Sequence, residues 1–271
     1  MTSTRCIAGR LPRGFTLVEM AVVVAIVGLL LAMGMYTLSA QSEQRAREET
    51  QRVLEAAREA LLGYAVANGR LPCPASGSGS AVEADAGGGV CSNGYDGFLP
   101  GVTLGFQPVD ADGYAVDGWN NRIRYAVATQ NVVSCAATPT QPHFTNKTNL
   151  KQNGMSCQPN TADLVICKSS VVSPAPAAGN CQGGGTNSVT NQGVVVAVVF
   201  SPGKNYPLAQ TSVAATAAGK FDEAENLDND SVFISHTPNP QGVAGGEFDD
   251  MLVWIPVGLF YGRLATAGVL P

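Results

Sequence analysis

GFTLVEMAVVVAIVGLLLAMGMYTL, residues 14–38, sets the organisation of this chain. The stretch is apolar almost throughout, and it has the roughly 20 residues that a helix needs to cross a bilayer. We therefore predict a transmembrane helix over residues 15–38. A short basic segment precedes it, and a polar segment and then a region rich in glycine and proline follow.

The one charge in this stretch is Glu19. A carboxylate inside an apolar span costs roughly 2.5–3.5 kcal/mol on insertion scales, so such a residue usually has a partner. Cleavage after Gly14 would make Phe15 the N-terminus, and the ammonium group of one subunit could then pair with Glu19 of its neighbour. The alternative is a signal-anchor helix whose Glu19 stays hydrated near the membrane interface, and the spacing does not choose between the two.

Residues 13–19, RGFTLVE, closely resemble the N-terminal processing motif of type IV pilins and type II secretion pseudopilins. The resemblance implies cleavage after Gly14 by a prepilin peptidase, N-methylation of Phe15, and a role for Glu19 in subunit register and assembly. It also implies the partners: other pilin or pseudopilin subunits, an inner-membrane assembly platform, and membrane lipid before assembly.

The leader, residues 1–14, holds three arginines and no acidic residue. By the positive-inside rule this end stays in the cytoplasm, so the chain crosses the inner membrane once and the remainder faces the periplasm. No small-residue cleavage site follows the apolar run, which disfavours an ordinary secretory signal peptide. We expect an inner-membrane protein that can also assemble into a periplasmic or surface filament.

Residues 39–68 continue as an amphipathic stem helix. Val53, Ala57, Leu61 and Tyr64 recur at spacings of three and four and form one apolar stripe. Asn68-Gly69 and then Pro72 end the pattern.

The remainder, residues 69–271, is predicted to be one globular domain. Its glycines and prolines (31 and 16 in the chain) and the low share of charged residues, 14%, favour a loop-rich β domain. The net charge of −5 and the lack of a basic patch argue against nucleic-acid binding. With two histidines in the chain, a site of several histidines for a metal is disfavoured.

Cysteine usage indicates an oxidising compartment. Cys6 lies in the leader, and six cysteines remain in the mature chain: Cys73, Cys91, Cys135, Cys157, Cys167 and Cys181. An even number suits three disulfides, although six cysteines allow 15 pairings. Short loops favour the pairs Cys73–Cys91, Cys135–Cys157 and Cys167–Cys181. The alternative is that some of them are free buried thiols.

The strands are predicted from apolar runs. These are residues 123–127, 162–167, 193–200 (buried and central), 231–236 and 251–257 with Trp254 in the core, followed by a short helix over 258–268. The turn at residues 117–121 resembles one found before a strand in major pseudopilins, with Asn120 where that family has glycine. We read Trp119 as structural, with sugar binding as the weaker alternative.

The expected fold is therefore α+β. The resemblance implies a pilin-like architecture in which the long N-terminal helix packs on an antiparallel sheet. Residues 134–192, rich in polar residues, glycine and cysteine, are interpreted as a loop-rich insertion pinned by disulfides.

Acidic residues gather at 222–230 and 247–250. Loops of carboxylates suit a hard cation such as Ca²⁺, which takes six to eight oxygen ligands. Major pseudopilins similarly bind Ca²⁺ in an acidic loop near the C-terminus, although the local order here differs. If a site exists, Asp228, Asp230 and Asp249 are the candidate ligands, with Glu225 and Asp250 in reserve. The alternative is a solvated acidic loop without any cofactor.

No motif for catalysis stands out, and we expect a protein that is not an enzyme. Ser201 follows Phe200 rather than the glycine of a GxSxG motif, and the sequence at Gly203-Lys204 lacks the other residues of a phosphate loop. The chain is best interpreted as a structural subunit of a pilin-like filament, either a type II secretion pseudopilin or a minor type IV pilin. The alternative is a filament-tip adhesin or ligand-binding module on the same anchor, with the insertion as its binding region.

Overall fold

The computed structural model describes residues 14–130, 142–177, 179–208, 210–240 and 242–270, and within the first helix it does not describe the side chains of residues 31–40. The chain divides into two compact units, Met1–Arg45 and Ala46–Pro271. Most of the expected leader, residues 1–13 with Cys6, lies outside the described residues, and so does Cys135.

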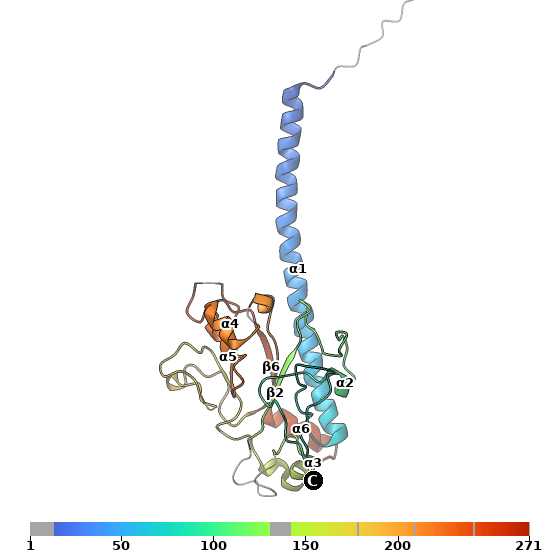
Figure 1. Ribbon diagram of the computed structural model, residues 1–271, viewed down its shortest axis with the longest axis vertical. Coiled ribbons are helices and arrows are strands. Elements are labelled where there is room, and N and C mark those ends of the chain that lie inside the picture. Colours follow the sequence, from blue (N-terminus) through green and yellow to red (C-terminus); the bar gives the residue numbers. More distant parts are fainter. Residues whose placement is uncertain (1–13, 131–141, 178, 209, 241, 271) are drawn as a thin grey trace, which may run out of the picture. The chain divides into compact units, whose positions relative to one another are not determined.

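Helix α1 (Leu17–Asn68) is the first element in the chain (Figure 1). The apolar side chains of residues 17–30 are exposed all round, and Leu17 has 88% of its surface accessible. No helix in the part of the chain searched, which leaves out the side chains of residues 31–40, is both long and apolar enough to span a membrane. Residues 31–38, the last third of the expected span, belong to this part whose side chains are not described.

The later part of α1 packs on the domain through the predicted stripe. Val53, Ala57 and Leu61 are buried, and Tyr64 is half-buried. Leu54, Leu62 and Ala65 are buried as well, so the apolar face is wider than the stripe. The helix ends where the sequence predicts, because Gly69 adopts a left-handed conformation (φ 72°) and its amide closes the last turn on the carbonyl of Ala65 at 2.8 Å.

The main sheet has four antiparallel strands in the order β1-β2-β4-β6. Their bounds are β1 (Gly97–Phe98), β2 (Arg124–Val127), β4 (Val195–Ser201) and β6 (Met251–Pro256). Every residue of β4 is buried and the strand lies between β2 and β6, as its unbroken apolar run predicts. The structure is therefore a mixed fold of helices and an antiparallel sheet.

A second sheet was not predicted. Strand β3 (Val165–Cys167) pairs with β5 (Val232–Ile234), and the two run parallel. Both strands lie in runs that the sequence marks as strands, but nothing local in a sequence states which strand pairs with which. The expected single antiparallel sheet is corrected accordingly.

The remaining helices are short. They are α2 (Gly101–Leu104), α3 (Lys147–Asn153), α4 (Ser212–Ala217), α5 (Phe221–Glu225) and α6 (Val257–Thr266), with 3-10 turns η1 (Gly154–Ser156), η2 (Gly183–Gly185) and η3 (Tyr206–Leu208). Helix α6 agrees with the prediction and buries Phe260 and Leu264. Helices α3 and α4 begin at side-chain caps, where Asn146 accepts from the Asn149 amide at 2.9 Å and Thr211 accepts from the Ala214 amide at 3.2 Å.

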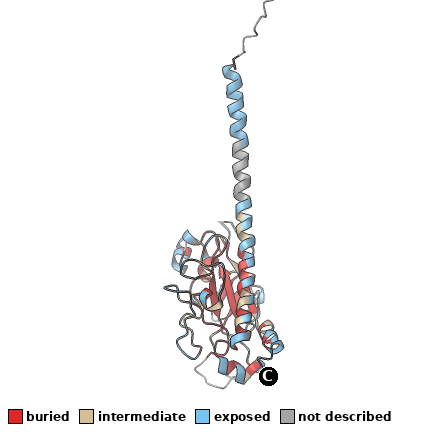
Figure 2. Cartoon of the chain, turned by 90° about the vertical axis from the view of Figure 1, so that its right-hand side faces the viewer, coloured by how far each residue is buried: buried red, intermediate tan, exposed pale blue. Residues whose placement is uncertain are grey.

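Figure 2 shows the buried residues gathered on the sheet and on the part of α1 that packs against it. Trp254, predicted to lie in the core, is half-buried and packs against this buried set rather than within it. Val253 and Ile255 point inward from β6, so the alternation of a strand turns Trp254 to the opposite face, where it is half-buried.

Candidate functional site

The start of α1 carries the predicted processing residues. Gly14 and Phe15 precede the helix and are exposed, with 84% of the Phe15 surface accessible. A Cβ atom built on Gly14 would meet nothing within 4 Å. The peptide bond after Gly14 therefore lies in an accessible segment just ahead of the helix.

Thr16 and Glu19 form a reciprocal cap at the first turn of α1. The Thr16 amide and hydroxyl donate to Oε2 of Glu19 at 2.8 and 2.9 Å, and the Glu19 amide donates to the Thr16 hydroxyl at 3.2 Å. This arrangement is a capping box. Its signal, Thr-x-x-Glu, is present in the sequence and could have predicted the cap. Because cleavage after Gly14 leaves the Thr16 amide intact, the cap is compatible with the processed chain.

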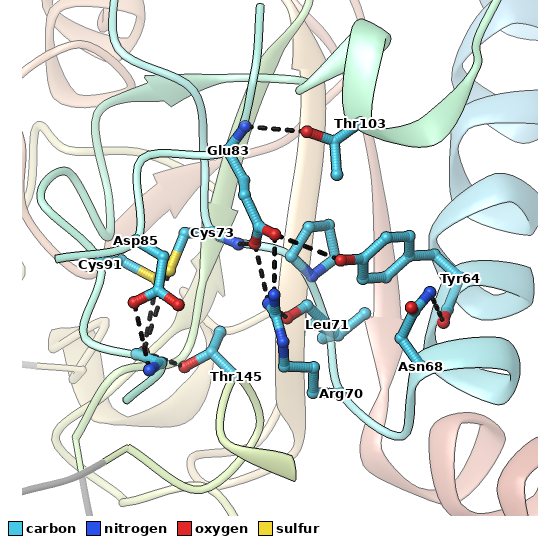
Figure 3. A network of polar contacts seen from close by, with 12 residues as sticks. Tyr64, Asn68, Arg70, Leu71, Cys73, Glu83, Asp85, Cys91, Thr103 and Thr145 are labelled. Atoms are coloured by element: carbon cyan, nitrogen blue, oxygen red, sulfur yellow. Dashed lines mark hydrogen bonds and ion pairs between the residues drawn. A yellow bond between two sulfur atoms is a disulfide. The ribbon is translucent and has the colours of Figure 1, made fainter. Parts of the chain in front are cut away.

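Beyond the end of α1, an ion pair ties the helix to the loop that follows (Figure 3). Arg70 donates to both carboxylate oxygens of Glu83 at 2.8 and 2.7 Å, and the Tyr64 hydroxyl donates to the same carboxylate at 3.2 Å. Burial raises the pKa of Glu83, but the bonds from Arg70 outweigh it, so the pKa is lowered. This network was not predicted from the sequence, because Glu83 lies 13 residues from Arg70 and 19 residues from Tyr64.

Two disulfides join the predicted partners. Cys73 is bonded to Cys91, and Cys167 is bonded to Cys181. Cys157 is also disulfide-bonded, while its expected partner Cys135 lies outside the described residues. The loop between the first pair has further support, because Oδ1 of Asp85 accepts the amides of Gly87 and Gly89 at 2.8 and 3.1 Å.

The turn before β2 has a structural role in the domain. Asp117 accepts the amides of Trp119 and Asn121 at 2.9 and 2.8 Å and the hydroxyl of Ser201 at 2.5 Å. Asn120 has a φ of 70°, so it takes the left-handed conformation expected where the resembling turn has glycine. The Gly118 amide donates to the Thr50 hydroxyl at 3.0 Å, which docks the turn on α1.

The acidic residues form two groups rather than one site. Asp228 and Asp230 lie with Glu225, whereas Asp249 lies with Glu223 and Asp250, and within each group the ligand atoms are within 4.8 Å of one another. The predicted trio of Asp228, Asp230 and Asp249 is therefore divided. Part of the expected acidic loop is the helix α5, which buries Glu223.

The group around Asp249 is buried. Oε1 of Glu223 accepts the side-chain amide of Asn205 at 2.9 Å and the Asp249 amide at 3.1 Å, and the Lys220 ammonium lies 3.4 Å from Oε2. Oδ1 of Asp249 is buried without a hydrogen-bond partner in the described structure. Burial, and then the charge of Glu223, raise the pKa of Asp249 to about 6. The same two causes raise the pKa of Asp250 well above its ordinary value.

The group around Glu225 is nearer the surface. Burial, and then the charges of Asp228 and Asp230, raise the pKa of Glu225 to about 8. Burial and the charge of Asp230 raise the pKa of Asp228 to about 7. Among the ion pairs of the described residues, none involves these three carboxylates.

Asp222 gathers a serine and a histidine without making a catalytic triad. Its carboxylate accepts the Ser170 amide at 2.6 Å, the Ser170 hydroxyl at 2.8 Å and Nε2 of His236 at 3.2 Å. Nδ1 of His236 lies 2.7 Å from the Thr237 carbonyl. Both ring nitrogens thus face acceptors, and the hydroxyl donates to the carboxylate instead of to a histidine base. This group fastens the segment at Ser170 to α5.

Comparison with known proteins identifies the N-terminal segment. Residues 10–35 match the family model of the prokaryotic N-terminal methylation motif, the signature of prepilin-type cleavage in type IV pilins and pseudopilins. The resemblance at residues 13–19 is thereby confirmed, and the motif supports a type IV pilin-like protein at the family level. It implies processing by a prepilin peptidase, membrane anchoring before assembly, and assembly with other pilin subunits. Searches of curated proteins and of solved structures find no match to this chain.

Proposed function

From a chain that carries this methylation motif, we propose a structural subunit of a pilin-like filament: a type II secretion pseudopilin or a minor type IV pilin. Its N-terminal segment is cleaved after Gly14 by prepilin peptidase, and Phe15 is methylated. The apolar part of α1 anchors the subunit in the inner membrane and then packs among the same helices of neighbouring subunits. The domain that begins at Ala46 stays on the periplasmic side.

The observation that carries this proposal is the motif together with the surface of residues 17–30. A helix that is apolar all round is stable when lipid or other helices cover it, and here those side chains are exposed. A pilin subunit occupies both environments in turn, first the membrane and then the filament. Glu19 already caps its own helix through Thr16, and its remaining hydrogen-bonding capacity is available to the N-terminal ammonium of a neighbour.

The test is the mass of the N-terminal peptide in cells with and without prepilin peptidase. We expect a peptide that begins at N-methylated Phe15, present when the peptidase is present and absent when it is deleted. Gly14→Leu should block cleavage, and Gly28→Ala is the matched control, because a Cβ atom at either glycine meets nothing within 4 Å. An unprocessed N-terminus in both strains would contradict the proposal.

We also propose that a divalent cation such as Ca²⁺ stabilises the domain at the buried group of Glu223, Asp249 and Asp250. The three buried carboxylates lie together, and the Lys220 ammonium, 3.4 Å from Glu223, is shared with Glu247 at 3.1 Å. Oδ1 of Asp249 lacks a hydrogen-bond partner in the described structure. Oxygen donors of this kind suit Ca²⁺. Calcium should raise the melting temperature of the chelator-treated protein, and Asp249→Asn should abolish that rise, whereas Asp112→Asn at an exposed position should retain it.

A specific hollow favours the second candidate function, a ligand-binding module on a pilin anchor. It has a volume of about 600 Å³ and lies in the disulfide-bearing insertion. The side chains around it are uncharged and are mostly amides and hydroxyls: Thr161, Asn180, Gln182, Ser188, Thr190, Asn191 and Gln192. Such a lining suits a neutral ligand with many hydroxyl groups, such as a glycan. Glycan-array binding that Asn191→Ala removes would support it, and an array without any signal would contradict it.

A further inference from the structure

A second hollow, also of about 600 Å³, lies between α4, α5 and the segment at Ser170 and Val171. It is far along the chain from the methylation motif, and neither role proposed above uses it. We call it the α4–α5 groove. Its lining residues are Ser170, Val171, Ser212, Val213, Thr216, Ala217, Phe221, Ala224, Glu225 and Asp228.

Packing and hydrogen bonds outside the groove hold its walls in place. Ala215 of α4 packs against Ala224 of α5 in a small buried cluster, and Thr211 caps the start of α4. Asp222 is buried and binds both the amide and the hydroxyl of Ser170, which fixes the third wall to α5. The groove is thus already formed before anything binds, and binding need not meet the cost of ordering a loop.

Three of the residues that line the groove are apolar and open to solvent, and we call them its apolar wall. Val213 has 78% of its surface exposed, Val171 has 51% and Phe221 has 45%. Exposed apolar side chains scattered singly are ordinary, but these three line the same hollow. An occupant with an aliphatic part would cover them.

Two of the lining residues are acidic, and we call this part of the groove its acidic end. Glu225 and Asp228 line it, and Asp230 completes their group within 4.8 Å. The described structure places neither an ion pair on these carboxylates nor a hydrogen-bond donor on that of Glu225. Like charges at this spacing repel, and in a half-buried setting the repulsion is screened less than in water. A cationic group would relieve it.

We propose that the α4–α5 groove is a docking site for a lysine or arginine side chain, flanked by an aliphatic residue, on an exposed segment of a partner protein. The alkyl stem of the basic side chain packs on Val213 and Val171, and its charged end reaches Glu225 and Asp228. Phe221 lines the same groove, and we expect its ring to contact the same cation. Charge complementarity and the apolar wall support this site whether or not the chain is a filament subunit.

The probe is the peptide acetyl-Ala-Leu-Lys-Leu-Ala-amide, titrated into the full-length protein in detergent micelles. Binding is followed by NMR of labelled valine methyl groups. We expect saturable shifts at Val171 and Val213, and an affinity about tenfold or more lower for the same peptide with norleucine in place of lysine. Equal binding of the two peptides would overturn the proposal. So would shifts produced by CaCl₂ or MgCl₂ and not by the lysine peptide, since the acidic end would then serve a metal ion alone.

Variants measure separately how much the acidic residues and the apolar wall contribute to peptide affinity. Glu225→Gln with Asp228→Asn should weaken the lysine peptide by about tenfold or more, because both carboxylates that would ionise beside the bound cation are removed. The matched control, Glu48→Gln with Asp112→Asn, removes two charges at exposed positions elsewhere and should leave the affinity unchanged. Val213→Ser should weaken binding several-fold while the exposed position preserves the fold. A charge-pair variant that binds as the parent does would contradict the docking site.

Discussion

Thr16 makes three hydrogen bonds with Glu19. Its hydroxyl accepts from the Glu19 amide, and its own amide and hydroxyl donate to the Glu19 carboxylate. Thr16→Ala should weaken the first turn of α1 by about 1 kcal/mol, because an N-cap hydroxyl is lost, whereas Thr16→Ser should keep the cap. Hydrogen exchange of the amides of residues 16–20 measures this in micelles, and the alanine variant should exchange about fivefold faster. Equal exchange in both variants would mean that the cap contributes nothing there.

Glu83 is the residue on which the loop after α1 depends. Its side chain is 16% exposed and that of Arg70 is 20% exposed, so their pair is poorly hydrated. Glu83→Gln should lower the free energy of unfolding by about 2 kcal/mol, since it leaves Arg70 without its charged partner. Urea titration measures the loss. Glu48→Gln, at an exposed helix position, is the control and should change stability by less than about 0.5 kcal/mol.

A disulfide and hydrogen bonds both restrain the loop of residues 73–91. The chain-entropy model assigns about 3 kcal/mol to a crosslink that closes a loop of this length, here a separation of 18 residues. Replacing Cys73 and Cys91 together by alanine should therefore lower the unfolding free energy by up to about 3 kcal/mol. Adding Glu83→Gln to this variant should cost more than the sum of the two changes, because each alone still leaves the other restraint on the loop. Simple additivity in the double-mutant cycle would contradict this coupling.

Among the elements, the sequence identified those that have a strong period or an unbroken apolar run. The stripe from Val53 to Leu61 predicted the packed face of α1, and the run before Ser201 predicted the buried central strand β4. It did not identify α4 and α5, because helices of five or six residues depend on caps and on tertiary packing more than on pattern. Nor could it pair β3 with β5, whose contact joins residues more than sixty positions apart.

The same contrast applies to the candidate sites. The methylation motif is local in sequence, so Gly14, Phe15 and Glu19 could be predicted as processing and assembly residues from residues 13–19 alone. The acidic group was not, because the chain brings Glu223 to Asp249 only when α5 packs beside the segment before β6. The described structure therefore places Asp249 in one group and Asp228 and Asp230 in another, a division that the sequence alone does not reveal.

The stability of the domain should fall as the pH rises from about 4 to about 8. The folded chain holds protons on Glu225 (pKa about 8), Asp228 (about 7) and Asp249 (about 6) that the unfolded chain releases near its ordinary carboxyl pKa. Folding therefore takes up protons in this window, and a rise in pH opposes it. The hydrogen bond from His236 to Asp222 acts in the same direction: burial lowers the His236 pKa, but this bond raises it above its ordinary value overall.

Urea midpoints measured with a chelator at several pH values check this expectation. Glu225→Gln should reduce the difference between the midpoints at about pH 5 and about pH 8, since the variant no longer loses a proton there. Asp112→Asn, whose carboxylate is largely exposed, should leave the difference as it is. A midpoint that rises with pH across this window would contradict the assignment of protons to the buried carboxylates.

The antiparallel pairing of β4 with β6 has a consequence for biosynthesis. Strand β6 and helix α6 come late in the chain, at Met251–Pro256 and Val257–Thr266, yet β6 completes one side of the central strand and α6 buries Phe260 in the common core. The domain therefore cannot close until the chain has been synthesised through α6. The N-terminal segment emerges first, so the peptidase can reach it while the rest is still an open chain. Premature termination before Met251 would leave the methylation motif on a chain that lacks β6 and α6 and cannot complete the sheet.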